Sequence, residues 1–375
     1  NLIGHAITHR LEQEGKSGAI SRLNFDTWWN GGMRTAPYYH NMIGILTETA
    51  HPSATPSTLA PETFPDTFAN GVPTLEPTTY YPNPYRGGEW HLRDSCDYML
   101  TASMAVLQIG AQRRREWLFN MYQMAREAIR KGADEQYVIP AKQWDPGTAS
   151  KMITALRLGG LEVQRATAPF SVDGHDYDAG SFVISGAQSF RPYLTDLMNP
   201  QVYPDLRLYP GGPPDTPYDI TGWTLPYQMG VRADRVGAVT APLEPVAEAG
   251  PPPGSIAESA GVAYAVDPRS NDAFTVVNRL LRTGDPLYRT TRSIAVDGED
   301  WPAGTFLVPP SEGARDRLET AARTLGLRIA AVADPATGDA WHVQPPRVAL
   351  YHRYGGDIDE GWTRWILEQF EFAFT

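Results

Sequence analysis

An internal repeat constrains the fold of this chain more than any other feature of its sequence. The run Val172-Asp173-Gly174 matches Val296-Asp297-Gly298, and residues 179–183 match residues 303–307 at the same spacing along the chain. A repeat of this long period indicates duplicated domains rather than a solenoid of short units. The sequence therefore predicts two copies of one small α/β module.

Each copy is predicted to contain a strand, a helix, a strand, an Asp-Gly turn, a strand and a last helix. The first strands begin near Tyr137 and Tyr264, and the last helices cover 189–197 and 314–325. Asp-Gly pairs suit turns that need positive φ. Neither copy contains a nucleophile elbow or a phosphate-binding glycine loop. We interpret both copies as non-catalytic, because the matched residues are of turn and core types.

A different kind of signal lies at residues 42–48, where the apolar run Met-Ile-Gly-Ile-Leu-Thr ends in Glu48. The run predicts a short buried strand that delivers a carboxylate at its C-terminal end. Burial raises the pKa of a carboxyl group, which is the usual way to prepare a general base near neutral pH. The alternative is a structural glutamate that forms an ion pair with Arg34.

The residues that precede this run are suited to contacting a ligand. Glycine pairs permit close approach of a backbone, and arginine and tyrosine side chains supply hydrogen-bond donors. The candidates for substrate contacts are Trp28, Gly31, Gly32, Arg34 and Tyr39.

The whole run FDTWWNGGMRTAPYYHNMIGILTETA resembles large bacterial zinc carboxypeptidases of the M14 type, which carry extra α/β modules after the peptidase. The phrases WHLRDSCDYML, PYDITGWTLPYQMG and DEGWTRWILEQF fit the same architecture. The resemblance implies an α/β fold, a peptide substrate, zinc as cofactor and a secreted or periplasmic location. It also implies that Glu48 is the general base that deprotonates a zinc-bound water.

The resemblance places the zinc ligands, a His-x-x-Glu pair and a distant His, before the segment that opens this chain. We therefore expect a fragment without metal ligands or the carboxylate-binding Arg. The stretch from His9 to Glu12 is a formal His-x-x-Glu match, but apolar residues at helical spacing surround it. We interpret His9 and Glu12 as residues on the solvated face of a helix.

The predicted organisation has five parts. Residues 1–132 form the C-terminal portion of a zinc-carboxypeptidase-like mixed sheet, closed by a long helix from Asp94 or Ser95 to Gly132. The remaining parts are the first module (133–235), a linker rich in Pro, Ala and Glu (236–262), the second module (263–345) and the start of a flavodoxin-like, amidotransferase-like domain (346–375). This last part begins with a strand at 347–351 and a helix capped by Asp359.

The proline-rich segment 52–88 is predicted to be a loop at the rim of the active site, because prolines break helices and central strands. Its aromatic end, from Tyr80 to Tyr85, has two interpretations. The aromatic side chains line a substrate pocket, or they pin the loop to the surface.

Composition excludes several classes of function. The net charge of −11 and the absence of a basic stripe argue against nucleic-acid binding. No apolar run approaches the length of a membrane span, and one cysteine rules out an internal disulfide framework. The rival to a peptidase is a non-catalytic binding or scaffold protein derived from such a hydrolase, in which the modules recognise peptide or glycan.

Overall fold

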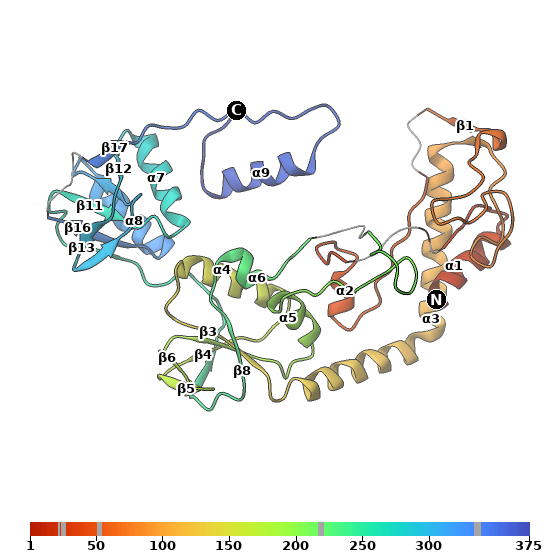
Figure 1. Cartoon of the computed structure of the whole chain (residues 1–375), viewed down its shortest axis with the longest axis horizontal. Helices are drawn as coiled ribbons and strands as arrows, with labels where there is room; N and C mark the ends of the chain where they lie inside the picture. Colours follow the sequence, from red (N-terminus) through yellow and green to blue (C-terminus); the bar gives the residue numbers. More distant parts are fainter. Residues whose placement is uncertain (22, 24–27, 51–54, 217–220, 334–338) are drawn as a thin grey trace. The chain divides into compact units, whose positions relative to one another are not determined.

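The computed structural model describes residues 1–21, 23, 28–50, 55–216, 221–333 and 339–375 (Figure 1). Residues 25–27 and 217–220, which belong to the motifs above, lie outside the described residues. The chain divides into two compact units: residues 1–131 with 188–223, and residues 132–187 with 224–375. Helices occur together with several antiparallel and mixed sheets, so the fold is of the general α/β class.

The first unit is mainly helical and has little sheet. Its described elements are α1 (Leu2–Gln13), α2 (Ala36–Tyr39), β1 (Ser57–Leu59), η1 (Pro61–Thr63), β2 (Gly88–Trp90), α3 (Leu92–Lys131) and α5 (Arg191–Met198). Strands β1 and β2 form an antiparallel pair. The large mixed sheet predicted for the start of the chain is absent from the described residues of this unit.

Helix α3 is the longest helix, and it is 40 residues long. Gly110 does not interrupt it, and it ends at the residue before Gly132, where the sequence predicts a stop. Acidic Asp94 lies in its first turn and basic Arg130 and Lys131 lie in its last, which stabilises the helix dipole at both ends.

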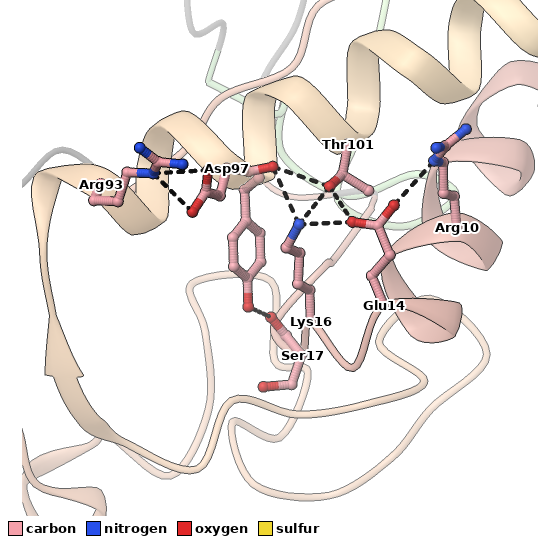
Figure 2. A network of polar contacts seen from close by, with 8 residues as sticks. Arg10, Glu14, Lys16, Ser17, Arg93, Asp97 and Thr101 are labelled. Atoms are coloured by element: carbon pink, nitrogen blue, oxygen red, sulfur yellow. Dashed lines mark hydrogen bonds and ion pairs between the residues drawn. The ribbon is translucent and has the colours of Figure 1, made fainter.

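A polar network attaches α1 to the first turns of α3 (Figure 2). Lys16 Nζ lies 2.7 Å from Glu14 Oε2 and 2.5 Å from Thr101 Oγ1, and the Thr101 hydroxyl donates to Glu14 at 2.6 Å. Arg10 pairs with the other Glu14 oxygen at 3.0 Å. Hydrogen bonds from Lys16, Thr101 and Arg10 together lower the pKa of Glu14 to about 2.

The proline-rich segment is held by its aromatic residues, as in the second interpretation given above. Tyr81 is buried and packs edge-on against Phe68, with ring centroids 5.4 Å apart. The Tyr81 hydroxyl accepts a hydrogen bond from the Tyr85 backbone N–H at 2.8 Å, and the Tyr85 ring packs against Trp90. These contacts pin the segment to the start of α3.

The second unit contains two larger sheets. The first has the order β8-β3-β7-β4-β9, and the second has the order β10-β16-β11-β15-β12-β17. The strands of the first sheet are β3 (Gln136–Ile139), β4 (Gln164–Ala166), β7 (Phe182–Ser185), β8 (Asp234–Val236) and β9 (Leu243–Pro245). Those of the second are β10 (Ser255–Ile256), β11 (Ala263–Val266), β12 (Tyr288–Thr290), β15 (Phe306–Val308), β16 (Arg328–Val332) and β17 (Ala340–His342).

The two sheets share one topology. Strands β8, β3, β7, β4 and β9 correspond in order to β16, β11, β15, β12 and β17, and all of these neighbours are antiparallel. Strand β10 is an addition to the second sheet, parallel to β16. The corresponding helices that follow the first strands are α4 (Pro146–Leu158) and α7 (Asp272–Thr283), and α8 (Ala314–Leu325) precedes β16. The two sheets therefore have the same strand order, but the helix predicted to end the first copy at 189–197 forms as α5 in the first unit, whereas its predicted counterpart α8 stays beside the second sheet.

The matched Asp-Gly pairs occupy the same place in both copies. Each turns a short hairpin: β5 (Phe170–Val172) with β6 (His175–Tyr177), and β13 (Ile294–Val296) with β14 (Glu299–Trp301). Asp173 and Asp297 both have φ of 50°, and the glycines that follow have φ of 79° and 80°. Two successive residues of positive φ give the turn that matches the twist of a hairpin.

Both faces of the second module's sheet are covered. One face packs Tyr264, Val266 and Phe306 against buried residues of α7 and α8, including Val276, Leu280 and Leu318. The other face packs Ala265 and Leu307 against Val296 and Trp301 of the hairpin. In the first module Val138 and Val183 pack in the same way against hairpin residue Tyr177.

The two modules meet at the N-termini of their equivalent helices. Asp145 is the N-cap of α4 and accepts from the Thr148 backbone N–H at 3.2 Å. It also accepts from the Asn271 backbone N–H, at the start of α7, at 2.9 Å, and from the Ser270 hydroxyl at 3.3 Å. Lys151 pairs with Asp272 at 2.7 Å. One buried carboxylate therefore satisfies donors of both helix starts.

The structure differs from the sequence interpretation in the two remaining parts. The segment 236–262 is not only a linker, because it contributes β9 to the first sheet and β10 to the second. In the tail, the predicted strand at 347–351 does not form, and a single bridge joins Val348 to Phe374. Helix α9 (Ile358–Gln369) does form, but Asp357 and not Asp359 caps it.

The tail docks on the second module through its last residues. Arg279 of α7 pairs with Glu371 at 2.7 Å, Arg282 pairs with the same carboxylate, and Asn278 Nδ2 donates to the Phe370 carbonyl at 2.8 Å. The hydrogen bond from Arg279 is the main cause of the lowered pKa of Glu371.

Candidate functional site

The first unit contains an open hollow, of about 460 Å³, between α2 and the segment around α5. Aromatic, carboxylate, amide and apolar side chains together form its wall, which consists of Trp28, Tyr39, Pro192, Thr195, Asp196, Asn199, Pro200, Gln201, Val202 and Trp223. Two of the predicted substrate-contact residues, Trp28 and Tyr39, are therefore brought together here with residues far away in the sequence.

Local structure explains how the first side of the hollow forms. The Thr35 hydroxyl is buried and donates to the carbonyls of Asn30 and Gly32, at 2.5 and 2.6 Å, which closes the loop before α2. Pro37 lies in the first turn of α2, where its missing N–H costs no helical hydrogen bond. Tyr39 is the last residue of this one-turn helix.

Aromatic and polar contacts fix α2 beside α5 (Figure 1). The His40 ring lies between Phe190 and Tyr193, with centroid distances of 4.7 and 4.9 Å. Asn41 has a φ of 59° and donates from Nδ2 to the Ser189 carbonyl at 2.8 Å. A left-handed backbone is more accessible to Asn than to most residues, so Asn41 ends the helix and binds α5 at once.

Asp196, on α5, is the central polar residue of the hollow. Its carboxylate Oδ2 accepts from Asn30 Nδ2 and, at 3.2 Å, from the indole N–H of Trp223. The Tyr39 hydroxyl is a third donor to this carboxylate. Burial raises the pKa of Asp196, and the hydrogen bonds from these three neutral donors oppose that effect.

The contact with Asp196 also affects the pKa of Tyr39. Burial raises the pKa of Tyr39 to about 12, and the negative charge of Asp196 and their hydrogen bond add to the shift. Tyr39 is therefore a neutral donor at physiological pH and not a general base.

Two of the lining residues, Trp28 and Trp223, belong to an aromatic cluster. The rings of Trp28 and Trp223 lie 5.1 Å apart at 62°, and those of Trp28 and Tyr203 lie 4.8 Å apart at 67°. The Trp28 indole N–H donates to the Thr221 carbonyl at 2.8 Å. Edge-to-face pairs of this kind stabilise aromatic clusters beyond the area that they bury.

The other predicted substrate-contact residues, Gly31, Gly32 and Arg34, are not among the residues that line the hollow. A methyl carbon on Gly31 would lie 2.0 Å from the Trp29 indole, and one on Gly32 would lie 3.3 Å from Arg34 Nη1. The space beside Gly31 and Gly32 is therefore occupied by the side chains of Trp29 and Arg34 and not by a ligand. Gly44 has the same role, because a methyl carbon there would lie 2.6 Å from the Arg34 carbonyl oxygen.

The predicted strand at residues 42–48 does not form. Met42, Ile43 and Ile45 have exposed side chains, and residues 43–50 have no regular structure. The physical reason is that a strand needs neighbours for its N–H and C=O groups. In the described part of this unit β1 and β2 pair with each other, and residues 43–50 pair with neither of them.

Glu48 is exposed at the end of this segment, so it is not the buried carboxylate that the sequence predicts. Its carboxylate forms no ion pair with any residue that the structure describes, so the alternative of a structural pair with Arg34 is wrong as well.

The described residues do not supply a zinc site. No group of three His, Cys, Asp or Glu side chains among them could hold a metal ion. His9 and Glu12 are both exposed on α1, and Glu12 accepts from Asn83 Nδ2 at 3.1 Å. The residues of this part of the chain therefore do not fit the cofactor that the resemblance implies.

Sequence reasoning missed Asp196, Trp223 and Tyr203, which lie far along the chain from Trp28. One local signal was available: Asp196 lies one helical turn after Pro192 on a short helix, and both residues line the hollow. Nothing in the sequence paired that helix with residues 28–41.

Comparison with protein-family models, with curated proteins and with solved structures gives no match to this chain. Among the helices in the described ranges, none combines the length and the apolar character that crossing a membrane requires.

Proposed function

We propose that this chain acts in peptide hydrolysis of the M14 type, with Glu48 as the general base and a peptide as the substrate. The observation that carries the proposal is the sequence run from Trp28 to Glu48, whose resemblance to zinc carboxypeptidases is described above. Glu48 is exposed and forms no ion pair with a described residue, so its carboxylate is accessible to a ligand. A secreted or periplasmic location belongs to the same proposal.

The hollow supports a role in holding the peptide. Trp28 and Tyr39 were selected as substrate contacts from sequence, and both line the same concave surface. Concave sites with apolar walls and a few placed polar groups are the usual form of ligand sites. Since the described residues do not fit zinc, no step of the reaction is assigned here to the metal.

In this proposal the two modules take no part in the chemistry. Their matched residues are turn residues, such as Asp173 and Asp297, and residues at the start of a strand, such as Val183 and Leu307. His175, in the first Asp-Gly turn, and Glu299, in the second, are both exposed.

A second candidate function is binding without catalysis, by a protein derived from such a hydrolase. The absence of a metal-binding group from the described residues, together with a formed hollow, favours it. The two candidates differ in what they require of Glu48, which is essential for hydrolysis and dispensable for binding.

The test is made on two samples. The 375-residue chain alone should bind zinc weakly and hydrolyse no peptide, because its described residues lack a metal site. The natural gene product that contains these residues, loaded with zinc, should hydrolyse peptides in a chelator-sensitive way. A gene product that neither binds zinc nor hydrolyses peptides supports the binding protein instead.

A further inference from the structure

Helix α3 carries a row of exposed apolar side chains along one face. Its buried residues Thr101 and Ala105 lie on another face, where the Thr101 hydroxyl donates to Glu14 at the end of α1. The members of the row are three, four, seven or eleven residues apart, and such steps return to the same side of a helix with 3.6 residues per turn. Apolar side chains exposed in a row, unlike single scattered ones, indicate an interaction surface. We call this row the apolar stripe, and it consists of Leu100, Met104, Leu107, Leu118, Tyr122 and Ile129.

The second half of α3 is basic, although the chain as a whole is acidic. Residues 111–131 contain six basic and two acidic side chains, whereas the net charge of the chain is −11. Glu116 and Glu127 each stand two residues before a member of the apolar stripe, which places them away from that face. They pair with Arg113 at 3.1 Å and with Lys131 at 2.8 Å. Negative charge is therefore kept off the stripe in this half of the helix.

Three arginines lie at the edges of the stripe. Arg114 and Arg115 precede Leu118 by four and three residues, and Arg126 follows Tyr122 by four, so each is a neighbour of the stripe on the helix surface. All three are exposed, and none forms an ion pair with a residue that the structure describes. The Arg126 guanidinium lies 5.6 Å from the centroid of the Tyr122 ring. The surface thus combines an apolar centre with positive edges.

A surface of this kind fits an anionic lipid membrane. Helices that lie in the membrane interface have an apolar face and basic residues beside it, and clusters of basic residues on such helices favour acidic lipids. Arginine side chains can bury their methylene groups while the charged end reaches the phosphates, and Tyr suits a boundary that is apolar on one side and wet on the other. A single helix presents a ridge, which a fluid lipid surface accommodates without a preformed groove.

We propose that the second half of α3 adsorbs to an anionic membrane surface. Leu118, Tyr122 and Ile129 enter the region between the headgroups, and Arg114, Arg115 and Arg126 contact the lipid phosphates. The helix lies in the plane of the surface and does not cross the membrane. This proposal goes beyond the proposed function and is independent of it, because it uses neither Glu48 nor the hollow.

The first experiment uses the unaltered 375-residue chain. Co-sedimentation compares its binding to vesicles of phosphatidylcholine alone with its binding to vesicles of equal parts phosphatidylcholine and phosphatidylglycerol. We expect about tenfold tighter binding or better to the anionic vesicles, and this preference should shrink as salt is raised. Because the net charge of the chain is −11, the chain as a whole is repelled by such vesicles, so adsorption requires a local basic surface.

The second experiment locates that surface by its charge. Arg114→Gln combined with Arg115→Gln should weaken binding to the anionic vesicles by about tenfold or more, since each cation near the surface contributes separately. The matched control combines Arg323→Gln with Arg347→Gln, which removes two exposed arginines outside α3 and should leave the affinity unchanged. Gln is a good helix former, and circular dichroism checks that each variant folds.

The third experiment tests the apolar stripe. Leu118→Gln removes an exposed leucine of the stripe and should weaken binding to the anionic vesicles by about fivefold or more. Leu158→Gln, at the end of α4, removes a leucine whose side chain is even more exposed and should have no effect.

Each outcome decides the proposal. No adsorption to the anionic vesicles, or equal adsorption to both kinds, overturns it even if a variant fails to fold. A lipid preference that the α3 variants retain, or that the control variants lose equally, overturns it as well. An acidic protein is the other occupant that this charge pattern suits. Binding of poly-glutamate by the chain without adsorption to vesicles would favour that occupant and overturn the membrane proposal.

Discussion

Short apolar runs occur both in the duplicated modules and at residues 42–48, and they fold differently in the two regions. In the modules, Ala263–Val266 is buried at every position, because helices cover one face of the sheet and a hairpin covers the other. In the first unit, Ile43 and Ile45 are exposed and no strand forms. An apolar run therefore specifies a strand only where the rest of the fold supplies hydrogen-bonding neighbours and a covering layer.

The two regions also differ in what holds them together. Apolar cores on both faces of a sheet stabilise the modules, whereas the described part of the first unit relies on aromatic contacts and polar networks. Hydrophobic burial is insensitive to pH, and networks of carboxylates are not. The following predictions test this difference.

The largest change in the free energy of unfolding is expected from shortening one isoleucine to alanine in the modules, compared with the same change at an isoleucine of the first unit. Ile184→Ala, in β7, deletes a fully buried side chain and should lower the free energy of unfolding by about 2–5 kcal/mol. Ile45→Ala deletes an exposed side chain and should change it by less than about 0.5 kcal/mol. Urea denaturation measures both, and equal effects would show that residues 42–48 are buried as a strand after all.

The next effect concerns catalysis. In the zinc-loaded gene product, Glu48→Gln should lower kcat by roughly a hundredfold or more, the scale of a lost general base. The melting temperature should not change, because Glu48 is exposed and forms no ion pair with a described residue. Glu76→Gln, another exposed site of this unit, is the control and should keep full kcat. Retained kcat in Glu48→Gln would remove the catalytic role.

A smaller effect is expected where the modules meet. Asp145→Ala removes the cap of α4 and the acceptor for Asn271 and Ser270, which should cost about 1–3 kcal/mol. Asp178→Ala, which breaks an exposed pair with Lys142, should cost less than about 1 kcal/mol. Thermal unfolding by calorimetry compares the two variants. Similar small losses would show that the modules do not depend on this contact.

The smallest effect is the pH dependence of the stability that Glu14 contributes through the polar network between α1 and α3. The folded pKa of Glu14, about 2, lies below its ordinary value of 4.5, so the folded state favours the ionised form. The stabilisation is therefore fully present above about pH 4.5 and is lost as the pH falls toward 2. The melting temperature of Glu14→Gln should lie below that of the unaltered chain at pH 6 and approach it at low pH. A difference independent of pH would exclude this ionisation as its cause.

The sequence alone determined the elements that depend on neighbours along the chain. The Asp-Gly turns at Asp173 and Asp297 follow from the φ angles that these residues tolerate. The long helix and its end before Gly132 follow from helical spacing and from the stop that glycine gives. The common strand order of the two sheets accords with the repeat, whose matched residues lie at the same turn and the same strand in each copy.

Tertiary structure alone decided which distant residues meet. Trp28 and Tyr39 were predicted as contacts, but Asp196 and Trp223, which complete the hollow, approach them only through the docking of α2 on α5. Tertiary structure also decided that residues 42–48 form no strand and that part of the predicted linker forms β9 and β10. The physical reason is the same in each case: sheet pairing and burial depend on partners that local sequence does not name.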